Sequence, residues 1–310
     1  MERLSRRNFM GRLGSIALIP GLAGLPAHGA RTANGEGIGL ALGSGGANGL
    51  AHIIVLETLE ELGVRPARIA GSSIGALIGA FAAAGHDSRD LRGLVKEFAP
   101  PDFASWAGAL FNRNRSTFLD FFELDMERGS LVDREAFERF LAEHLAAEDF
   151  ESLSIPLTVT ATDFWAREPV TFESGPLIPP VLASIALPGV FAPIRIGDRL
   201  LVDGGMVNPV PWDLIQDSVS FTVAVDVVGQ RTPPANGDPG YLDTIFNSFQ
   251  IMQNSIIRTK RRISEPDLYL RPPITGIRVL DFHKAESVYR QAEPVKDELK
   301  RALEPFLSAT

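Results

Sequence analysis

The stretch that most constrains the fold is Gly71-Ser72-Ser73-Ile74-Gly75, where a buried strand gives way to a buried helix. Apolar spacing predicts the strand over residues 68–72 and the helix over residues 74–84, with Gly85 at its end. A serine between two glycines at such a turn presents its hydroxyl at the end of a sheet. The pattern predicts an α/β fold with Ser73 as a candidate nucleophile. An ordinary strand-to-helix loop of small residues is the alternative.

A second glycine-rich loop precedes this turn. Residues 38–42 predict a buried strand, which opens into Gly43-Ser44-Gly45-Gly46-Ala47-Asn48-Gly49, and residues 47–62 have helical apolar spacing. A strand, a helix and a second strand in this order form a unit with parallel strands, so both loops emerge at the carboxyl edge. Backbone N–H groups at the start of a helix stabilise a phosphate or a developing oxyanion.

Two phosphate-binding motifs do not fit this loop. A dinucleotide-binding fingerprint counted from Gly43 needs glycine where Asn48 stands, and no acidic residue closes a second strand about twenty residues later. A P-loop needs Gly-Lys-Ser or Gly-Lys-Thr, which the loop lacks. The remaining interpretation is an oxyanion hole beside Ser73.

A candidate base for Ser73 stands at the end of a later predicted strand. Residues 200–202 are apolar and lead to Asp203, which Gly204 and Gly205 follow. A carboxylate that accepts the serine proton needs close approach and an uncrowded backbone, and two glycines allow both. A glycine-rich turn with a side-chain hydrogen bond from Asp203 to the backbone is the alternative.

Together, the glycine-rich loop, the serine turn and Asp203-Gly204-Gly205 resemble the patatin-like phospholipase family. The resemblance implies a three-layer α/β/α sandwich with a mostly parallel central sheet. It also implies a serine acyl hydrolase for lipid carboxylic esters, of the phospholipase or lysophospholipase type, which works through a Ser-Asp dyad without histidine. Ser73 would be the nucleophile and Asp203 the base. The implied oxyanion hole consists of the backbone N–H groups of Ser44, Gly45 and Gly46.

Two positions of the glycine-rich loop depart from the family pattern. Ser44 stands where a third glycine is usual, which matters little because the loop acts through backbone N–H groups. Asn48 stands where arginine or lysine is usual, so a positive charge near the site is lost. That loss favours a second hypothesis, in which the chain is a catalytically silent lipid-binding protein.

A conventional Ser-Asp-His triad is a further alternative. His283 follows Ser73 and Asp203 in the chain order that α/β-hydrolases use. However, residues 281–284 predict a surface turn, and the glycines after Asp203 already suit a direct pair with Ser73. We therefore favour the dyad, and we expect His52, on the helix after the glycine-rich loop, to have a capping or core role.

Composition limits the partners of the chain. Its formal net charge of -8 gives no electrostatic support for binding nucleic acid. It has no cysteine, which excludes disulfides and thiolate metal sites, and no carboxylates occur at the spacing of a calcium loop. The expected partner is a lipid ester substrate, with contact to a membrane or lipid surface allowed, and we expect no metal and no cofactor.

The N-terminus predicts export. Residues 1–30 contain Arg6-Arg7, a short apolar run over residues 16–25 and a small-residue stretch before Ala30, which resembles a twin-arginine signal peptide. Residues 31–36 predict a linker, and residues 37–310 predict the acyl hydrolase domain. The mature protein is then expected in the periplasm, or in the cytoplasm if the signal interpretation fails.

Residues 87–150 predict a helical, aromatic-rich insertion in the domain. Its aromatic residues include Trp106 and Phe111, near Arg113 and Arg115. An apolar rim of this kind suits contact with aggregated lipid. A small helical subdomain that closes over the core is the alternative.

Overall fold

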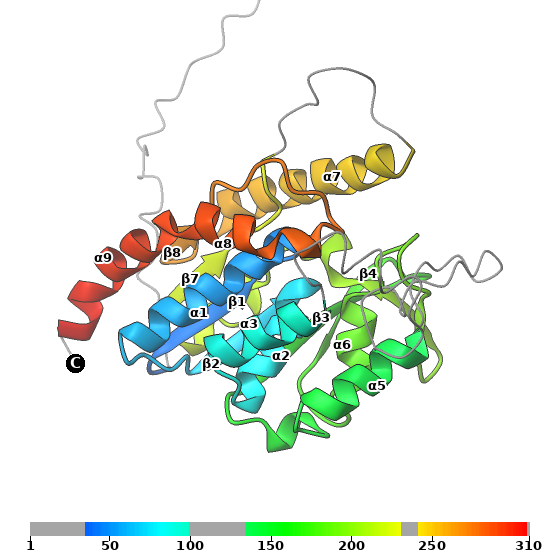
Figure 1. Cartoon of the computed structure of the whole chain (residues 1–310). Coiled ribbons are helices and arrows are strands. Elements are labelled where there is room, and N and C mark those ends of the chain that lie inside the picture. The colour runs from blue at the N-terminus through cyan, green and yellow to red at the C-terminus, as the bar shows by residue number, and fades with distance from the viewer. Residues whose placement is uncertain (1–34, 99–133, 231–240, 309–310) are drawn as a thin grey trace, which may run out of the picture. The chain divides into compact units, whose positions relative to one another are not determined.

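The computed structural model describes residues 35–98, 134–230 and 241–308 (Figure 1). Contacts divide the chain into residues 1–32 and 33–310, and all described residues belong to the second unit. The predicted signal peptide, most of the predicted linker, and the aromatic residues Trp106 and Phe111 lie outside the described residues. The export and rim predictions therefore stay predictions.

The described part of the chain contains one sheet of eight strands. The strands are β1 (Ile38–Leu42), β2 (Arg68–Ser72), β3 (Leu157–Asp163), β4 (Glu168–Phe172), β5 (Ile194–Ile196), β6 (Arg199–Asp203), β7 (Phe221–Val225) and β8 (Leu268–Leu270). Their spatial order is β5-β6-β3-β2-β1-β7-β8, and β4 pairs with β3 outside this path. The pairings from β3 across to β8 are parallel, whereas β4, β5 and β6 join by antiparallel pairings.

Eight α-helices are described around this sheet. They are α1 (Ala51–Glu61), α2 (Ile74–Ala84), α3 (Ser88–Phe98), α5 (Arg134–His144), α6 (Ile178–Ser184), α7 (Tyr241–Ile263), α8 (Ala285–Ala292) and α9 (Pro294–Ser308). Within the described ranges, no helix has the length and hydropathy needed to cross a bilayer.

Side chains alternate between the two faces of the central strands. In β1, Leu40 and Leu42 pack in a large core cluster that includes residues of α1 and α2, which lie in front of the sheet in Figure 1. Ala41, between them, faces a smaller cluster with Trp212 and with Ile257 of α7. Both faces of the sheet are therefore covered, as the period-two alternation of a buried strand requires. The predicted three-layer α/β/α arrangement with a mostly parallel sheet is confirmed.

The elements nearest the serine turn agree with the sequence prediction. Strands β1 and β2 and helix α2 have the predicted bounds, with Gly85 as the left-handed cap of α2. The helix predicted over residues 47–62 differs, because a 3₁₀ turn (Gly46–Leu50) precedes α1. Gly46 has a φ of 57°, which places the start of this turn in a backbone conformation that favours glycine. Of the predicted helical insertion, the structure describes α3 and α5.

Candidate active site

Ser73 occupies a sharp turn between β2 and α2. Its φ of 56° and ψ of -126° are rare for a residue with a side chain, and such strain costs about 1–3 kcal/mol. Neighbouring groups hold the turn, because the Ser73 N–H donates to Ser184 Oγ at 2.9 Å and Ala76 N–H donates to the Ser73 carbonyl at 2.9 Å. The hydroxyl therefore projects past the end of the strand, as the sequence predicts.

The two glycines of this turn allow a close approach of backbone segments. A Cβ on Gly71 would come within 2.4 Å of Ala76 Cα, and a Cβ on Gly75 would come within 2.1 Å of the Leu42 carbonyl oxygen. Any larger residue at either position would displace backbone atoms. Gly71 thus lets the start of α2 lie close to β2, and Gly75 lets it lie close to the end of β1.

Strand register brings Asp203 to Ser73. Ser72, the last residue of β2, is paired with Thr160 of β3, and the next residue of β3, Ala161, is paired with Asp203 of β6. The pairing of β3 with β6 therefore starts at the residue after the last one that pairs with β2. Ser73 and Asp203 each lie one step beyond the Ser72–Thr160 pair, and the Ser73 hydroxyl donates to Asp203 Oδ2 at 2.5 Å.

The Asp203 carboxylate is buried and held at both oxygens. Only 2 % of the residue is exposed, and Oδ1 accepts the Gly205 N–H at 2.7 Å. Burial raises the pKa of Asp203 to about 7, although the hydrogen bonds from Ser73 and Gly205 act in the opposite direction. Desolvation thus makes this carboxylate a stronger base than an exposed aspartate.

Gly204 and Gly205 fit the crowded backbone beside this carboxylate. A Cβ on Gly204 would lie 2.0 Å from the Thr160 carbonyl oxygen, and a Cβ on Gly205 would lie 2.4 Å from Ser44 Oγ. The second contact shows that the loop after Asp203 touches the glycine-rich loop. The sequence predicted both loops at one edge of the sheet, and the structure brings them together.

The glycine-rich loop offers two backbone donors instead of three. The N–H of Ser44 donates to the Pro209 carbonyl at 2.8 Å, so the prediction of this N–H as an oxyanion donor is wrong. Within the described residues, the N–H groups of Gly45 and Gly46 have no hydrogen-bond partner, and both glycines line the same cavity as Ser73. Of the three predicted donors, the N–H groups of Gly45 and Gly46 therefore remain candidates for an oxyanion hole.

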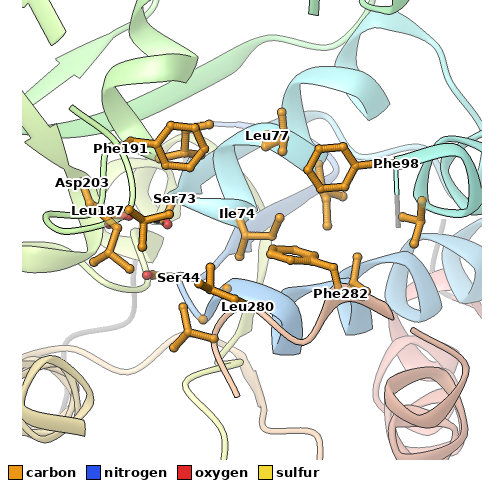
Figure 2. Close-up of a pocket in the computed structure, with 18 of the residues that line it drawn as sticks. Ser44, Ser73, Ile74, Leu77, Phe98, Leu187, Phe191, Asp203, Leu280 and Phe282 are labelled. Carbon is orange, nitrogen blue, oxygen red and sulfur yellow. Dashed lines mark hydrogen bonds between the residues drawn. The ribbon is translucent and has the colours of Figure 1, made fainter. Parts of the chain in front are cut away.

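Ser73 and Asp203 lie at one end of a cavity of about 150 Å³. Figure 2 shows Ser44 beside them, while the side chains of Leu77 and Phe98 lie farther along the cavity. Most of its described lining is aliphatic or aromatic and comes from α1, α2, α3, α5 and α7 and the segments around residues 185–191 and 279–282. A polar reaction centre at the end of an apolar cavity suits a substrate with an apolar chain next to the reacting bond.

The described histidines do not complete a triad. His52 is fully buried and donates from Nε2 to the Gly43 carbonyl at 2.8 Å, and burial lowers its pKa to about 4. His52 is therefore neutral, and its hydrogen bond to Gly43 stabilises the glycine-rich loop. His283 is exposed in the 3₁₀ turn Phe282–Lys284 and does not line the cavity. Among the described residues, no histidine is hydrogen-bonded to Ser73 or Asp203.

Asn48 is not part of the cavity lining. It is 3 % exposed, in the 3₁₀ turn before α1, and does not line the cavity. Its Oδ1 has no hydrogen-bond partner among the described residues. Asn48 therefore contributes no side chain to the lining of the cavity.

Two residues that were not predicted as site residues support the site. Ser184, at the end of α6, accepts the Ser73 N–H and donates to the Thr160 carbonyl at 2.7 Å. Gln253 of α7 donates to Ser44 Oγ at 3.0 Å and to the Gly205 carbonyl at 3.2 Å. The sequence predicts residues 183–189 as the end of a helix packed under the site, which agrees with the position of Ser184 at the end of α6. Nothing in the pattern of α7 distinguished Gln253 from its other polar residues.

The part of the chain that carries this site matches a known protein family. A profile of the family described as Patatin-like phospholipase matches residues 40–215. An uncharacterized NTE family protein of Mycobacterium tuberculosis is 37% identical over 199 residues, which are 64% of this chain and 51% of that protein. Lysophospholipase NTE1 of Kluyveromyces lactis is 30% identical over 284 residues, 84% of this chain and 19% of that protein.

The chain therefore spans about half the length of the mycobacterial relative and about a fifth of the fungal one. Among solved structures, VipD from Legionella pneumophila aligns with a TM-score of 0.44 and 15% sequence identity, over 85% of this chain and 67% of that chain.

Proposed function

Because the chain belongs to the patatin-like phospholipase family, we propose that it is a serine acyl hydrolase for carboxylic esters of lipids. Ser73 is the nucleophile in this proposal, and Asp203 accepts its proton. The observation that carries the proposal is the 2.5 Å hydrogen bond from Ser73 Oγ to Asp203 Oδ2 at the end of an apolar cavity. The acyl chain occupies that cavity, and the ester carbonyl lies at Ser73.

In the first half of the reaction, Ser73 Oγ bonds to the ester carbonyl carbon while its proton passes to Asp203 Oδ2. The carbonyl oxygen becomes an oxyanion, and the N–H groups of Gly45 and Gly46 stabilise its charge. When the tetrahedral intermediate collapses, the bond to the alcohol oxygen breaks. The departing alcohol takes the proton from Asp203, and the acyl group remains on Ser73.

Water completes the reaction. Asp203 accepts a proton from the water molecule as its oxygen bonds to the acyl carbon, and the same two N–H groups stabilise the second oxyanion. The bond from that carbon to Ser73 Oγ then breaks. Ser73 recovers its proton from Asp203, and the fatty acid leaves. Asp203 thus acts as a base and then as an acid in each half of the reaction. A carboxyl with a pKa of about 7 suits both roles, because it gains and loses a proton readily near neutral pH.

The apolar lining favours lipids over short polar esters. The fungal relatives are named lysophospholipases, so we choose a lysophospholipid, which carries a single acyl chain, as the first substrate to test. Apart from Ser73 and Asp203, the polar lining residues among those described are Ser44, Gln250 and Gln253. None carries a charge, so the cavity selects the acyl chain rather than the head group.

The test is release of free fatty acid from palmitoyl lysophosphatidylcholine by the parent chain and by Ser73→Ala. We expect the parent to release fatty acid and Ser73→Ala to be slower by about a thousandfold or more, because the nucleophile is gone. Binding of the same lipid by both proteins is the control. If both bound the lipid and neither released fatty acid, the chain would be the silent lipid-binding protein instead.

A further inference from the structure

Gln253 joins the two loops that meet at the reaction centre. Its Nε2 lies 3.0 Å from Ser44 Oγ on the glycine-rich loop and 3.2 Å from the Gly205 carbonyl oxygen on the loop after Asp203. The side chain reaches both from α7, and the residue is 9 % exposed. One buried amide therefore contacts both loops.

The direction of these hydrogen bonds follows from the groups involved. A carbonyl oxygen only accepts, so the Gln253 atom that faces Gly205 must be the amide nitrogen. That nitrogen has two N–H bonds and accepts nothing, so its second N–H donates to Ser44 Oγ. Ser44 is therefore an acceptor toward Gln253, and its own hydroxyl proton is left to bind another group.

The Ser44 hydroxyl proton has no acceptor among the described residues. Among the described residues, the hydrogen bond with Gln253 is the only one that Ser44 Oγ makes. Ser44 is 4 % exposed and lines the cavity together with Gly45 and Gly46. It lies at the same end of the cavity as Ser73 (Figure 2). An acceptor that enters the cavity at this end can take the proton.

We propose that the Ser44 hydroxyl is a side-chain donor of the oxyanion hole and that Gln253 is the positioning residue that directs it. The backbone N–H of Ser44 is already used by Pro209, so this residue contributes through its side chain instead. The inference rests on the proposed function, because an oxyanion forms only when Ser73 attacks an ester. It adds a third donor to the N–H groups of Gly45 and Gly46.

The first test removes the hydroxyl in Ser44→Ala, with Ser44→Gly as a second variant that also lacks it. Loss of one oxyanion donor lowers kcat by about a hundredfold while KM changes little, because the hydrogen bond strengthens only in the transition state. Ser248→Ala is the matched control, since Ser248 is an exposed serine of α7 outside the cavity. Parent-like kcat in both folded Ser44 variants would overturn the proposal.

The second test asks whether Gln253 acts through Ser44. Gln253→Leu removes the amide that orients the Ser44 hydroxyl, so it should lower the kcat of the parent about tenfold. In the Ser44→Ala background the same change should have almost no further effect on kcat. Losses that multiply in the double variant would mean that Gln253 has only a structural role and would contradict this part of the proposal.

These results are separate from those that test the proposed function. If the parent released no more fatty acid than Ser73→Ala, the proposed function would be wrong and this inference would be wrong with it. If the parent is active and the Ser44 variants keep its kcat, only the inference is wrong. Unfolding curves for each variant show whether a lost rate reflects a lost fold.

Discussion

Asp203→Asn is expected to slow ester hydrolysis by about a thousandfold or more. The substitution keeps the shape of the side chain but removes the carboxylate, whose Oδ2 accepts the hydrogen bond from Ser73 Oγ at 2.5 Å. The variant should keep the fold, because ionising the buried Asp203 carboxyl destabilises the folded parent and an amide does not ionise. The pKa of Asp203 is raised to about 7 from an ordinary value near 4, so the parent loses stability as the pH rises between these values. A neutral amide avoids that loss.

His283→Ala is the matched comparison for this prediction. Because His283 is exposed and outside the cavity lining, its removal should leave the rate within a few fold of the parent. In a Ser-Asp-His triad the histidine would carry the proton, so His283→Ala would be as damaging as Ser73→Ala. A fall of His283→Ala to that level would overturn the dyad.

The rate should also fall about tenfold for each pH unit below about 7. Asp203 accepts the serine proton only when it is ionised, and burial raises its pKa to about 7. Below that pH the protonated fraction grows tenfold per unit, and at pH 5 kcat/KM should be about a hundredfold below its plateau. The measurement is kcat/KM for a soluble ester between pH 5 and 9, because this ratio reports ionisation in the free enzyme.

Two variants show which group causes the fall in kcat/KM below about pH 7. A histidine base would also make kcat/KM fall at low pH, so His283→Ala must show the same fall as the parent if Asp203 is responsible. The residual kcat/KM of Asp203→Asn should not fall between pH 7 and pH 5. A kcat/KM that stays level down to pH 5 in the parent would show that Asp203 ionises near its ordinary value, and the prediction would be wrong.

The elements around Ser73 could be predicted from the sequence because local patterns determine them. Strand β2 is an apolar run, α2 has helical spacing with a terminal glycine, and the turn between them needs glycines at fixed positions. The glycines after Asp203 were equally informative. Each of these features depends on residues within about ten positions of one another, which is the range that pattern reasoning covers.

The remaining parts of the site depend on long-range packing. The pairing of Ser73 with Asp203 follows from a register between β3 and β6 that no short pattern encodes. The Ser44 N–H was predicted to be free, but the Pro209 carbonyl lies against it, and that contact joins residues far apart in the sequence. Gln253 was missed for the same reason, since its partners lie on two distant loops.

Labelling with a fluorophosphonate shows whether Asp203 activates Ser73, because this reagent bonds covalently to an activated serine. We expect one label per chain in the parent and in His283→Ala, located on Ser73 by peptide mass spectrometry. Ser73→Ala should take up no label, and labelling of Asp203→Asn should be slower by orders of magnitude because its serine is not activated. A label on another serine, or a folded parent that takes up none, would contradict the claim that Asp203 activates Ser73 as the nucleophile.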